Sequence, residues 1–234
     1  MHSQRTSPTS FSFIQEHGYG IFPSIFSAGE IATLASELFE SQLKRSRAGA
    51  RHILCVPAVR RLAEDSRLLE IARAVLGPLA LPFRATLFDK SPTSNWLVAW
   101  HQDTALPLAE RIEAAGWGPW SIKEGVTYAH APTEALEQVL ALRVHLDDST
   151  PANGPLRVIP KTHLGGVLTD VEIQEIASMP DATECTVETG GVIGMRPLVI
   201  HASSKSENDS PRRVIHIEYA SRVEIAGNLH LAIV

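Results

Sequence analysis

The feature of this sequence that most constrains its fold is a series of short β-prone runs that begins near Leu81. Each run is rich in β-branched, aromatic and other apolar residues, and Pro, Gly, Asn and Asp separate one run from the next, as in short strands joined by turns. Eight runs qualify, at residues 83–90, 96–103, 138–147, 154–160, 184–189, 191–195, 197–203 and 212–220. We therefore expect a mainly β protein with the architecture of a double-sheet jelly roll.

The residues before this series predict flanking helices. Ser27, followed three residues later by Glu30, is typical of a capping box, and the apolar face expected of this helix is Ile31, Leu34, Leu38 and Phe39. A second helix is expected after Asp65 or Ser66, and its apolar face would be Leu68, Leu69, Ala72 and Leu76. With no linker or internal repeat, the sequence predicts a single domain over residues 1–234, with a helical part in about 1–79 and a β-barrel core in about 80–222.

Composition narrows the classes of partner. The chain has 234 residues, a formal net charge of −5 and no basic run interleaved with aromatic residues, so neither nucleic acid nor a membrane surface is an expected partner. No obligate protein partner is inferred. The two cysteines are far apart, which excludes a disulfide framework and a thiolate metal cluster, and no signal peptide or spanning apolar segment is recognised. A cytoplasmic protein is the resulting expectation.

Two His-x-Asp motifs are candidate metal-binding pairs. They are His101-Gln102-Asp103 and His145-Leu146-Asp147. Alternate side chains of a strand share a face, so either pair can offer an imidazole nitrogen and a carboxylate oxygen to one ion. A third ligand must come from elsewhere, and His201, in the apolar run RPLVIHASS, is the best candidate. The alternative for a lone histidine there is a core residue satisfied by hydrogen bonds.

A polar turn, KSENDS, separates His201 from the run that begins at Arg212. An antiparallel hairpin centred between Ser206 and Glu207 would place Arg212 opposite His201 and on the same side, with Arg213 pointing away. A buried arginine beside a metal site suits bidentate binding of a dicarboxylate cosubstrate.

Several segments in order then resemble one known family. LFDKSPTSNWLVAWHQDT, LALRVHLDDSTPANGPLRVIPKTH, GGVIGMRPLVIHASS and PRRVIHIEYA together resemble the phytanoyl-CoA dioxygenase family of iron(II)- and 2-oxoglutarate-dependent oxygenases. FIQEHGYGIFPSIFSAGEIATL resembles the opening strand and helix of that family, so the resemblance covers nearly the whole chain. It implies a double-stranded β-helix, a cupin-like jelly roll with N-terminal helices packed on the barrel.

The resemblance also implies the site. The catalytic metal would be iron(II), with His101, Asp103 and His201 as its ligands. Arg212 would bind the 5-carboxylate of 2-oxoglutarate, and Ser203 and Lys90 lie where the family commonly places further contacts to this cosubstrate. For Ser203 the alternative is a strand-end hydroxyl bonded to backbone, and for Lys90 a solvated loop lysine.

Strand order argues against the second His-x-Asp motif, because His145 leaves room for too few strands before His201. The segment HLDDSTPANGPLRVIP instead resembles a hairpin of the family, with Asn153-Gly154 as its turn. His145 and Asp147 are then expected to be structural or to line the pocket. Arg143, on the same strand face, can meet an acidic group of the substrate or form a surface ion pair.

The stretch from about residue 105 to 136 shows no clear period and is interpreted as an irregular insertion over the barrel mouth. It would contribute Trp117, Trp120, Tyr128 or His130 to a substrate pocket. The alternative is that both tryptophans only anchor the loop to the core.

The activity implied by the resemblance is oxidation of a small-molecule substrate by dioxygen, with conversion of 2-oxoglutarate into succinate and carbon dioxide. The carboxylate of Asp103 favours hydroxylation, since related halogenases have a small residue at that position. Desaturation or another oxidative outcome stays compatible with the same ligands. Two alternatives from other classes are a cupin-like metalloenzyme that does not use 2-oxoglutarate and a non-catalytic small-molecule-binding barrel.

Overall fold

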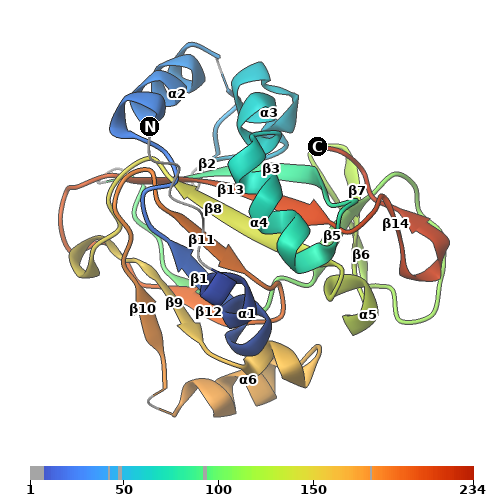
Figure 1. Ribbon diagram of the computed structural model, residues 1–234. Coiled ribbons are helices and arrows are strands. Elements are labelled where there is room, and N and C mark those ends of the chain that lie inside the picture. Colours follow the sequence, from blue (N-terminus) through green and yellow to red (C-terminus); the bar gives the residue numbers. More distant parts are fainter. Residues whose placement is uncertain (1–7, 42, 47–48, 92–93, 180) are drawn as a thin grey trace.

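Two antiparallel β-sheets packed face to face form the centre of the computed structural model, which describes residues 8–41, 43–46, 49–91, 94–179 and 181–234 (Figure 1). The six-stranded sheet has the order β1 (Tyr19–Phe22), β11 (Val192–Met195), β8 (Val139–His145), β13 (Arg212–Ala220), β3 (Leu81–Lys90) and β2 (Gly49–Ala50). The four-stranded sheet has the order β10 (Thr183–Cys185), β9 (Leu156–Ile159), β12 (Ile200–Ser203) and β4 (Val98–His101). Each of the eight runs overlaps one of these strands, and the predicted jelly roll is confirmed.

Side-chain alternation gives the six-stranded sheet two different faces. On β8, Leu142 and Val144 belong to the apolar cluster under the helices. Ala141, which precedes Leu142 and points to the opposite face, packs instead with Leu156 and Val158 of the four-stranded sheet. Arg143 and His145 share the inner face with Ala141, so β8 presents polar groups to the space between the sheets.

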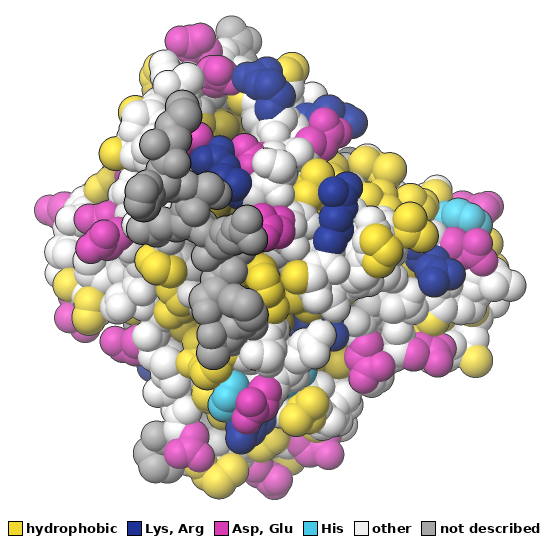
Figure 2. Space-filling model, viewed as in Figure 1, with side chains coloured by type: hydrophobic (Ala, Val, Ile, Leu, Met, Phe, Trp, Pro, Cys, Tyr) yellow, Lys and Arg dark blue, Asp and Glu magenta, His cyan; other side chains and the backbone are white. Residues whose placement is uncertain are grey.

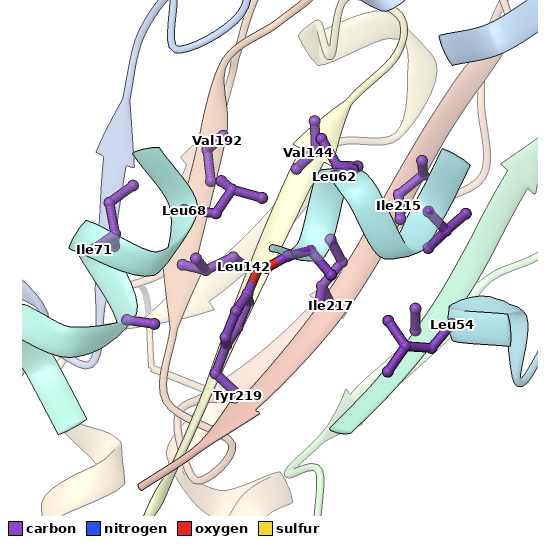
Figure 3. Close-up of a cluster of buried hydrophobic side chains, with 14 of the residues drawn as sticks. Leu54, Leu62, Leu68, Ile71, Leu142, Val144, Val192, Ile215, Ile217 and Tyr219 are labelled. Atoms are coloured by element: carbon purple, nitrogen blue, oxygen red, sulfur yellow. Dashed lines mark hydrogen bonds between the residues drawn. The ribbon is translucent and has the colours of Figure 1, made fainter. Parts of the chain in front are cut away.

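Four helices accompany the outer face of the six-stranded sheet: α1 (Pro8–His17), α2 (Ala28–Glu40), α3 (Pro57–Ala63) and α4 (Ser66–Leu76). Figure 3 shows α3 and α4 lying on the strands, with Leu62 and Leu68 directed at Leu142, Ile217 and their neighbours. The hydroxyl of Tyr219 donates a hydrogen bond to the carbonyl of Ala63 at 2.8 Å. No helix in the described part of the chain has the length and apolar character needed to cross a membrane.

Smaller elements complete the described structure. Helix α6 (Asp170–Ala177) packs on the outer face of the four-stranded sheet, where Ile173 meets Ile159 and Ile200. The short 3-10 helices are η1 (Ile53–Cys55), η2 (Pro151–Asn153), η3 (Thr162–Gly165) and η4 (Ala226–Asn228), and β14 (Glu224–Ile225) pairs with β15 (Leu229–His230).

Both predicted helices are found. The capping box of Ser27 and Glu30 forms at the start of α2, and Asp65 caps α4. One residue of the expected apolar face is wrong: Phe39 is 83 % exposed although Leu38 is buried, because neighbouring residues of a helix lie about 100° apart around its axis. Helices α1 and α3 are additional to the prediction.

The predicted hairpin between the His201 and Arg212 strands is wrong. His201 pairs with His101 on β4 and with Val158 on β9, whereas Arg212 pairs with Lys90 on β3. Strands β12 and β13 therefore belong to different sheets, and the connection between them crosses from one sheet to the other. Arg212 still faces the interior, because it lies on the inner face of β13 and contacts Ser203 across the gap.

The predicted Asn153-Gly154 hairpin is also wrong. Strand β8 pairs with β11 and β13, while β9 pairs with β10 and β12, so the segment between them is a corner that joins the two sheets. Asn153 ends the 3-10 helix η2, and Gly154 adopts a left-handed backbone with φ of 67°.

The expected irregular insertion is in fact ordered as a small sheet. Strands β5 (Ala105–Leu108), β7 (Val126–His130) and β6 (Trp120–Lys123) pair in that order, and α5 (Thr133–Leu136) follows. Its strands are short and broken by several Gly and Pro residues, which hid the two-residue period.

The face shown in Figure 2 carries acidic and basic side chains interspersed, without a continuous basic surface among the residues described there.

Replacing Gly154 by alanine should destabilise the protein, because an added Cβ would lie 2.3 Å from the carbonyl oxygen of Ser204. Gly125 is a matched control, since its φ of 83° is also left-handed but no atom lies within 4 Å of an added Cβ. Left-handed backbone alone costs roughly 1–2 kcal/mol for a non-glycine residue, and overpacking adds about 1–3 kcal/mol. Chemical denaturation should show a larger loss of unfolding free energy for Gly154→Ala than for Gly125→Ala, and equal losses would contradict the close approach at this corner.

Candidate active site

The structure brings together the three residues predicted to bind a metal. His101 ends β4, Asp103 follows it, and His201 lies on the neighbouring strand β12, opposite His101 in the ladder. The Nε2 atoms of His101 and His201 each lie 3.5 Å from an oxygen of Asp103, on Oδ1 and Oδ2 respectively. The three candidate ligand atoms are all within 4.8 Å of one another, so one ion can contact all of them.

Backbone hydrogen bonds orient both imidazoles for this purpose. Nδ1 of His101 lies 2.8 Å from the carbonyl oxygen of Ala99, and Nδ1 of His201 lies 2.9 Å from that of Val199. A carbonyl only accepts, so each Nδ1 carries the hydrogen and each Nε2 presents a lone pair toward Asp103. Two imidazole nitrogens and one carboxylate are the donor set typical of non-haem iron(II) oxygenases, and the residues therefore fit an iron(II) ion.

The protonation of His201 and Asp103 suits metal binding, whereas His101 has to lose the proton that Asp103 favours. Burial lowers the pKa of His201 to about 4, which leaves this imidazole neutral near pH 7. Burial would raise the pKa of Asp103, but electrostatic interaction with His201 and the hydrogen bond and charge of His101 hold it well below its usual range. Burial likewise opposes protonation of His101, yet the hydrogen bond and charge of Asp103 raise its pKa overall. The side chains of His101 and Asp103 are 39 % and 32 % exposed, so one side of the triad is open.

Gln102 is a positioning residue that the sequence did not suggest. Its Nε2 donates to the carbonyl oxygens of Gly166 and Leu198 at 2.9 and 2.8 Å, and its Oε1 accepts from the amide of Leu168 at 2.9 Å. The amide of Asp103 donates to the carbonyl of Pro197 at 2.9 Å. These bonds tie the His-x-Asp segment to the chain just before His201 and to the loop that follows η3. The sequence signal that could have identified Gln102 is its position between the candidate ligands His101 and Asp103.

The second His-x-Asp motif is separated by the end of its strand. Strand β8 stops at His145, and Asp147 turns away to bind Arg213, with an Nη2 to Oδ1 distance of 2.7 Å. His145 is 0 % exposed and neither ring nitrogen has a hydrogen-bond partner. Burial and the nearby Arg143 and Arg212 lower the pKa of His145 to about 3, so its imidazole is neutral.

Arg212, Ser203 and Lys90 meet in the interior on the other side of His201. Nζ of Lys90 donates to Oγ of Ser203 at 2.8 Å and to the carbonyl of Ser204 at 2.5 Å. Arg212 donates through Nη2 to the same Oγ at 3.2 Å and through Nε to the carbonyl of Asn153 at 3.3 Å, while its buried Nη1 has no partner. Two cations thus converge on one hydroxyl.

Burial of these two cations is reflected in their pKa values. Burial and the charges of Arg212 and Arg143 lower the pKa of Lys90 to about 7. Burial and the charge of Arg143 lower the pKa of Arg212 to about 9. A carboxylate between them would relieve both effects, because it would offset the repulsion and the lost hydration.

Arg143 lies on the inner face of β8, and not in a surface ion pair. Its Nη1 lies 3.0 Å from Nδ1 of His216, which occupies the paired position on β13. His216 was not predicted, although it shares a strand face with Arg212 at a spacing of four residues.

The aromatic candidates of the insertion lie at different depths. Trp117 is buried in a cluster with Leu106, Leu229 and other residues of the small sheet, and Trp120 packs against this cluster. The hydroxyl of Tyr128 lies 2.8 Å from Nε2 of His52, a residue of the N-terminal part. His130 lies at the surface with Nδ1 2.7 Å from Oγ1 of Thr104, next to Asp103 in the chain.

Similarity to known proteins agrees with this geometry. The facing sheets define a double-stranded β-helix protein, with the candidate metal site at the open side of the four-stranded sheet. The family model of phytanoyl-CoA dioxygenase (PhyH) matches residues 14–214. The chain belongs to the phytanoyl-CoA dioxygenase family.

Sequence identity to individual relatives is low. Ectoine dioxygenase of Sphingopyxis alaskensis is 28 % identical over 184 residues, which are 70 % of this chain and 53 % of the relative. The chain spans about half the length of the curated relatives it matches. The crystal structure of EctD from S. alaskensis with 2-oxoglutarate and 5-hydroxyectoine superposes with a TM-score of 0.70 at 22 % identity, covering 95 % of this chain and 79 % of that one. HygX from Streptomyces hygroscopicus, with nickel and 2-oxoglutarate bound, gives 0.65 at 18 % identity, covering 92 % and 87 %.

Replacing His201 by alanine should abolish tight binding of iron(II), because only two of the three convergent ligands would remain. We expect a loss of at least roughly 100-fold in affinity, comparable to the upper effect of disturbing ligand support. Anaerobic titration of the purified protein with iron(II) would measure it.

His145→Ala is the matched control, because His145 belongs to the second motif and lies on the opposite sheet. Its variant should retain the metal. Loss of metal in His145→Ala together with retention in His201→Ala would show that the second His-x-Asp motif, and not the first, binds the metal.

Proposed function

We propose that this protein is an iron(II)- and 2-oxoglutarate-dependent dioxygenase that hydroxylates a small-molecule substrate. One observation carries the proposal: three convergent ligands, from β12 and the end of β4, lie beside a buried cluster of Arg212, Lys90 and Ser203 that has no carboxylate partner within the described residues. A metal site beside a carboxylate-binding site is what a metal-chelating dicarboxylate requires. The name of the S. alaskensis relative, ectoine dioxygenase, supports the same reaction class.

His101, Asp103 and His201 would hold the iron(II). When bound, the metal supplies the redox chemistry that couples the conversion of 2-oxoglutarate and dioxygen into succinate and carbon dioxide to insertion of one oxygen atom into a substrate C–H bond. The carbonyls of Ala99 and Val199 keep the two imidazoles in the metal-binding tautomer. Asp103 supplies the carboxylate, and its presence favours hydroxylation over halogenation.

Arg212, with Ser203 and Lys90, would bind the 5-carboxylate of 2-oxoglutarate. Nη1 of Arg212 has no hydrogen-bond partner, and burial lowers the pKa values of Arg212 and Lys90. Both observations favour binding of an anion between these two side chains. Tyr128 and His130 are retained as candidate substrate contacts, and the placement of Trp117 and Trp120 favours anchoring of the small sheet.

Two other functions make different predictions. A cupin-like metalloenzyme without 2-oxoglutarate would leave Arg212 a purely structural role, and a non-catalytic barrel would bind a small molecule without turnover. A single domain over residues 1–234 and a cytoplasmic location belong to the same proposal.

Incubation with iron(II), 2-oxoglutarate and air should yield succinate above a metal-free control. Removing one member of a buried charge pair costs about 2–5 kcal/mol, so Arg212→Ala should weaken 2-oxoglutarate binding on the order of 30-fold to several thousand-fold. Arg213→Ala should do much less, because Arg213 faces outward and pairs with Asp147. Unchanged 2-oxoglutarate affinity in both variants would remove the main support for the proposed cosubstrate.

The affinity for 2-oxoglutarate should also depend on pH through Lys90, whose pKa is lowered to about 7. Below this pKa the ammonium is present to meet a carboxylate, and above it the free site loses that charge. A bound carboxylate raises the pKa of Lys90, so binding takes up a proton and the affinity falls as pH rises, by at most about tenfold per pH unit.

Calorimetric titration of the metal-saturated protein between pH 6 and pH 9 would measure this dependence. Lys90→Met should remove it while lowering the affinity at the acidic end. Deprotonation of His101 acts in the opposite sense, since it favours metal binding as pH rises. A fall in affinity that persists in Lys90→Met would therefore exclude Lys90 as its source.

A further inference from the structure

Arg143 is a buried cation without a matching anion. It is 8 % exposed, and its Nε has no hydrogen-bond partner. In the described ranges no carboxylate lies at ion-pair distance from it, and its one polar contact is the ring of His216. Removing a guanidinium from water without pairing it is costly, so an isolated Arg143 is unfavourable for stability alone.

His216 cannot neutralise Arg143. An arginine only donates, so Nδ1 of His216 must accept, and the imidazole is therefore unprotonated on that nitrogen. Burial and the charge of Arg143 hold the pKa of His216 well below its usual range, which keeps the ring neutral. Phe88 packs beside both, with its ring centroid 5.3 Å from Cζ of Arg143 and 5.7 Å from the His216 ring. The guanidinium is thus held in place but not neutralised.

The interior still carries excess positive charge after the proposed metal and cosubstrate are bound. Lys90, Arg143 and Arg212 bring positive charge into the interior, and Asp103 is the acid that acts on Arg143. Arg84 and Glu218 pair with each other. An iron(II) ion and a 2-oxoglutarate dianion cancel, so they leave the excess positive charge where it was.

The position of Arg143 separates it from the cosubstrate carboxylate. Arg212 is paired with Lys90, whereas Arg143 is paired with His216, four residues farther along β13. At about 3.4 Å per residue this is roughly 13–14 Å along the strand. Arg143 therefore starts from a backbone position well separated from Arg212, and its charge acts on Asp103 at the candidate metal site as well as on Arg212 and Lys90.

The small sheet brings further positive charge to the same end of the interior. Nζ of Lys123 lies 4.7 Å from the ring centroid of Tyr128, and Cζ of Arg84 lies 5.6 Å from the same ring. Burial and the charges of Arg84 and Arg51 lower the pKa of Lys123, and the charge of Asp103 opposes this lowering. Glu124, beside Lys123 in the chain, is engaged by Arg51 at 3.8 Å and by His52 at 3.9 Å.

From this arrangement we infer that the substrate carries a carboxylate and that Arg143, fixed by His216 and Phe88, is the residue that binds it. The inference rests on the proposed oxygenase function and adds the chemical class of the substrate. The same carboxylate chemistry could come from the metal-bound end of 2-oxoglutarate, so the test has to distinguish the two sources.

The experiment uses the full chain, loaded with iron(II) under anaerobic conditions. Calorimetry first measures binding of 2-oxoglutarate, and then, at saturating 2-oxoglutarate, binding of butyrate, hexanoate, benzoate and phenylacetate. The primary amides of the same acids serve as neutral probes of equal shape. At least one carboxylate should bind at least about tenfold more tightly than its amide, as a charge-assisted bidentate contact requires.

Arg143→Met should lower the affinity for that carboxylate by a factor at least about tenfold greater than the factor for 2-oxoglutarate. Arg143→Lys should restore part of the lost affinity, because lysine keeps the positive charge. Arg157→Met is the matched control, since Arg157 also lies over an aromatic ring, at 5.0 Å from Trp100, but on the outer face of its sheet. Arg157→Met should leave carboxylate binding within about threefold of the wild type.

The outcomes separate the possibilities. Failure of the wild type to bind 2-oxoglutarate would refute the proposed function itself. Normal 2-oxoglutarate binding without carboxylate preference would refute the inference alone. A loss of 2-oxoglutarate affinity in Arg143→Met that equals or exceeds the loss for the probe would assign Arg143 to the cosubstrate. If Arg143→Met does not fold, the comparison of Arg143→Lys with the amide series decides the question in the same way.

Discussion

The apolar contact between helices α3 and α4 and the outer face of the six-stranded sheet is the interaction on which the rest of the structure depends. Leu142, Val144, Ile215, Ile217 and Tyr219 are buried there against Leu62 and Leu68 (Figure 3). Burying one large apolar side chain contributes about 1.5–3 kcal/mol. The same strands carry Arg143 and Arg212 on their other face, where desolvation of each charge costs several kcal/mol, and the neutral His145, whose ring nitrogens have no partner. The outer face therefore stabilises strands whose inner face is unfavourable without a ligand.

That unfavourable inner face makes the interior a candidate binding site. Orphaned atoms of Arg143, His145 and Arg212 lie along two neighbouring strands, and burial lowers the pKa of Lys90 and of both arginines. Native proteins seldom leave buried polar groups unpaired, and exceptions mark sites where something binds. The candidate metal ligands show the complementary arrangement, because hydrogen bonds to backbone carbonyls already fix both imidazoles. The candidate cation site is thus preorganised on the four-stranded sheet, while the buried cations Lys90, Arg143 and Arg212 come from the six-stranded sheet.

The elements that position the site differ in how far the sequence could predict them. The strand carrying His101 and the run carrying His201 follow from short-range patterns, and the resemblance to the oxygenase family selected three residues that the structure brings together. The roles of Gln102 and His216 could not be predicted from the sequence, because the role of an amide or an imidazole depends on the distant residues that it contacts. Tyr128 was singled out as an aromatic of a loop, but it is the neighbour of His52 from a segment 76 residues away.

The sequence by itself determined the local features: the eight core strands, the capped starts of α2 and α4, and the alternation that sends Arg212 inward and Arg213 outward. Tertiary structure alone decided which sheet each strand joined, and both hairpins expected from turn residues became crossings between sheets. The reason is physical: turn residues set the local backbone, whereas strand pairing depends on which distant apolar surfaces are buried together. Contacts such as Lys90 to Ser203, 113 residues apart, and Arg143 to His216, 73 residues apart, exist only after that choice has been made.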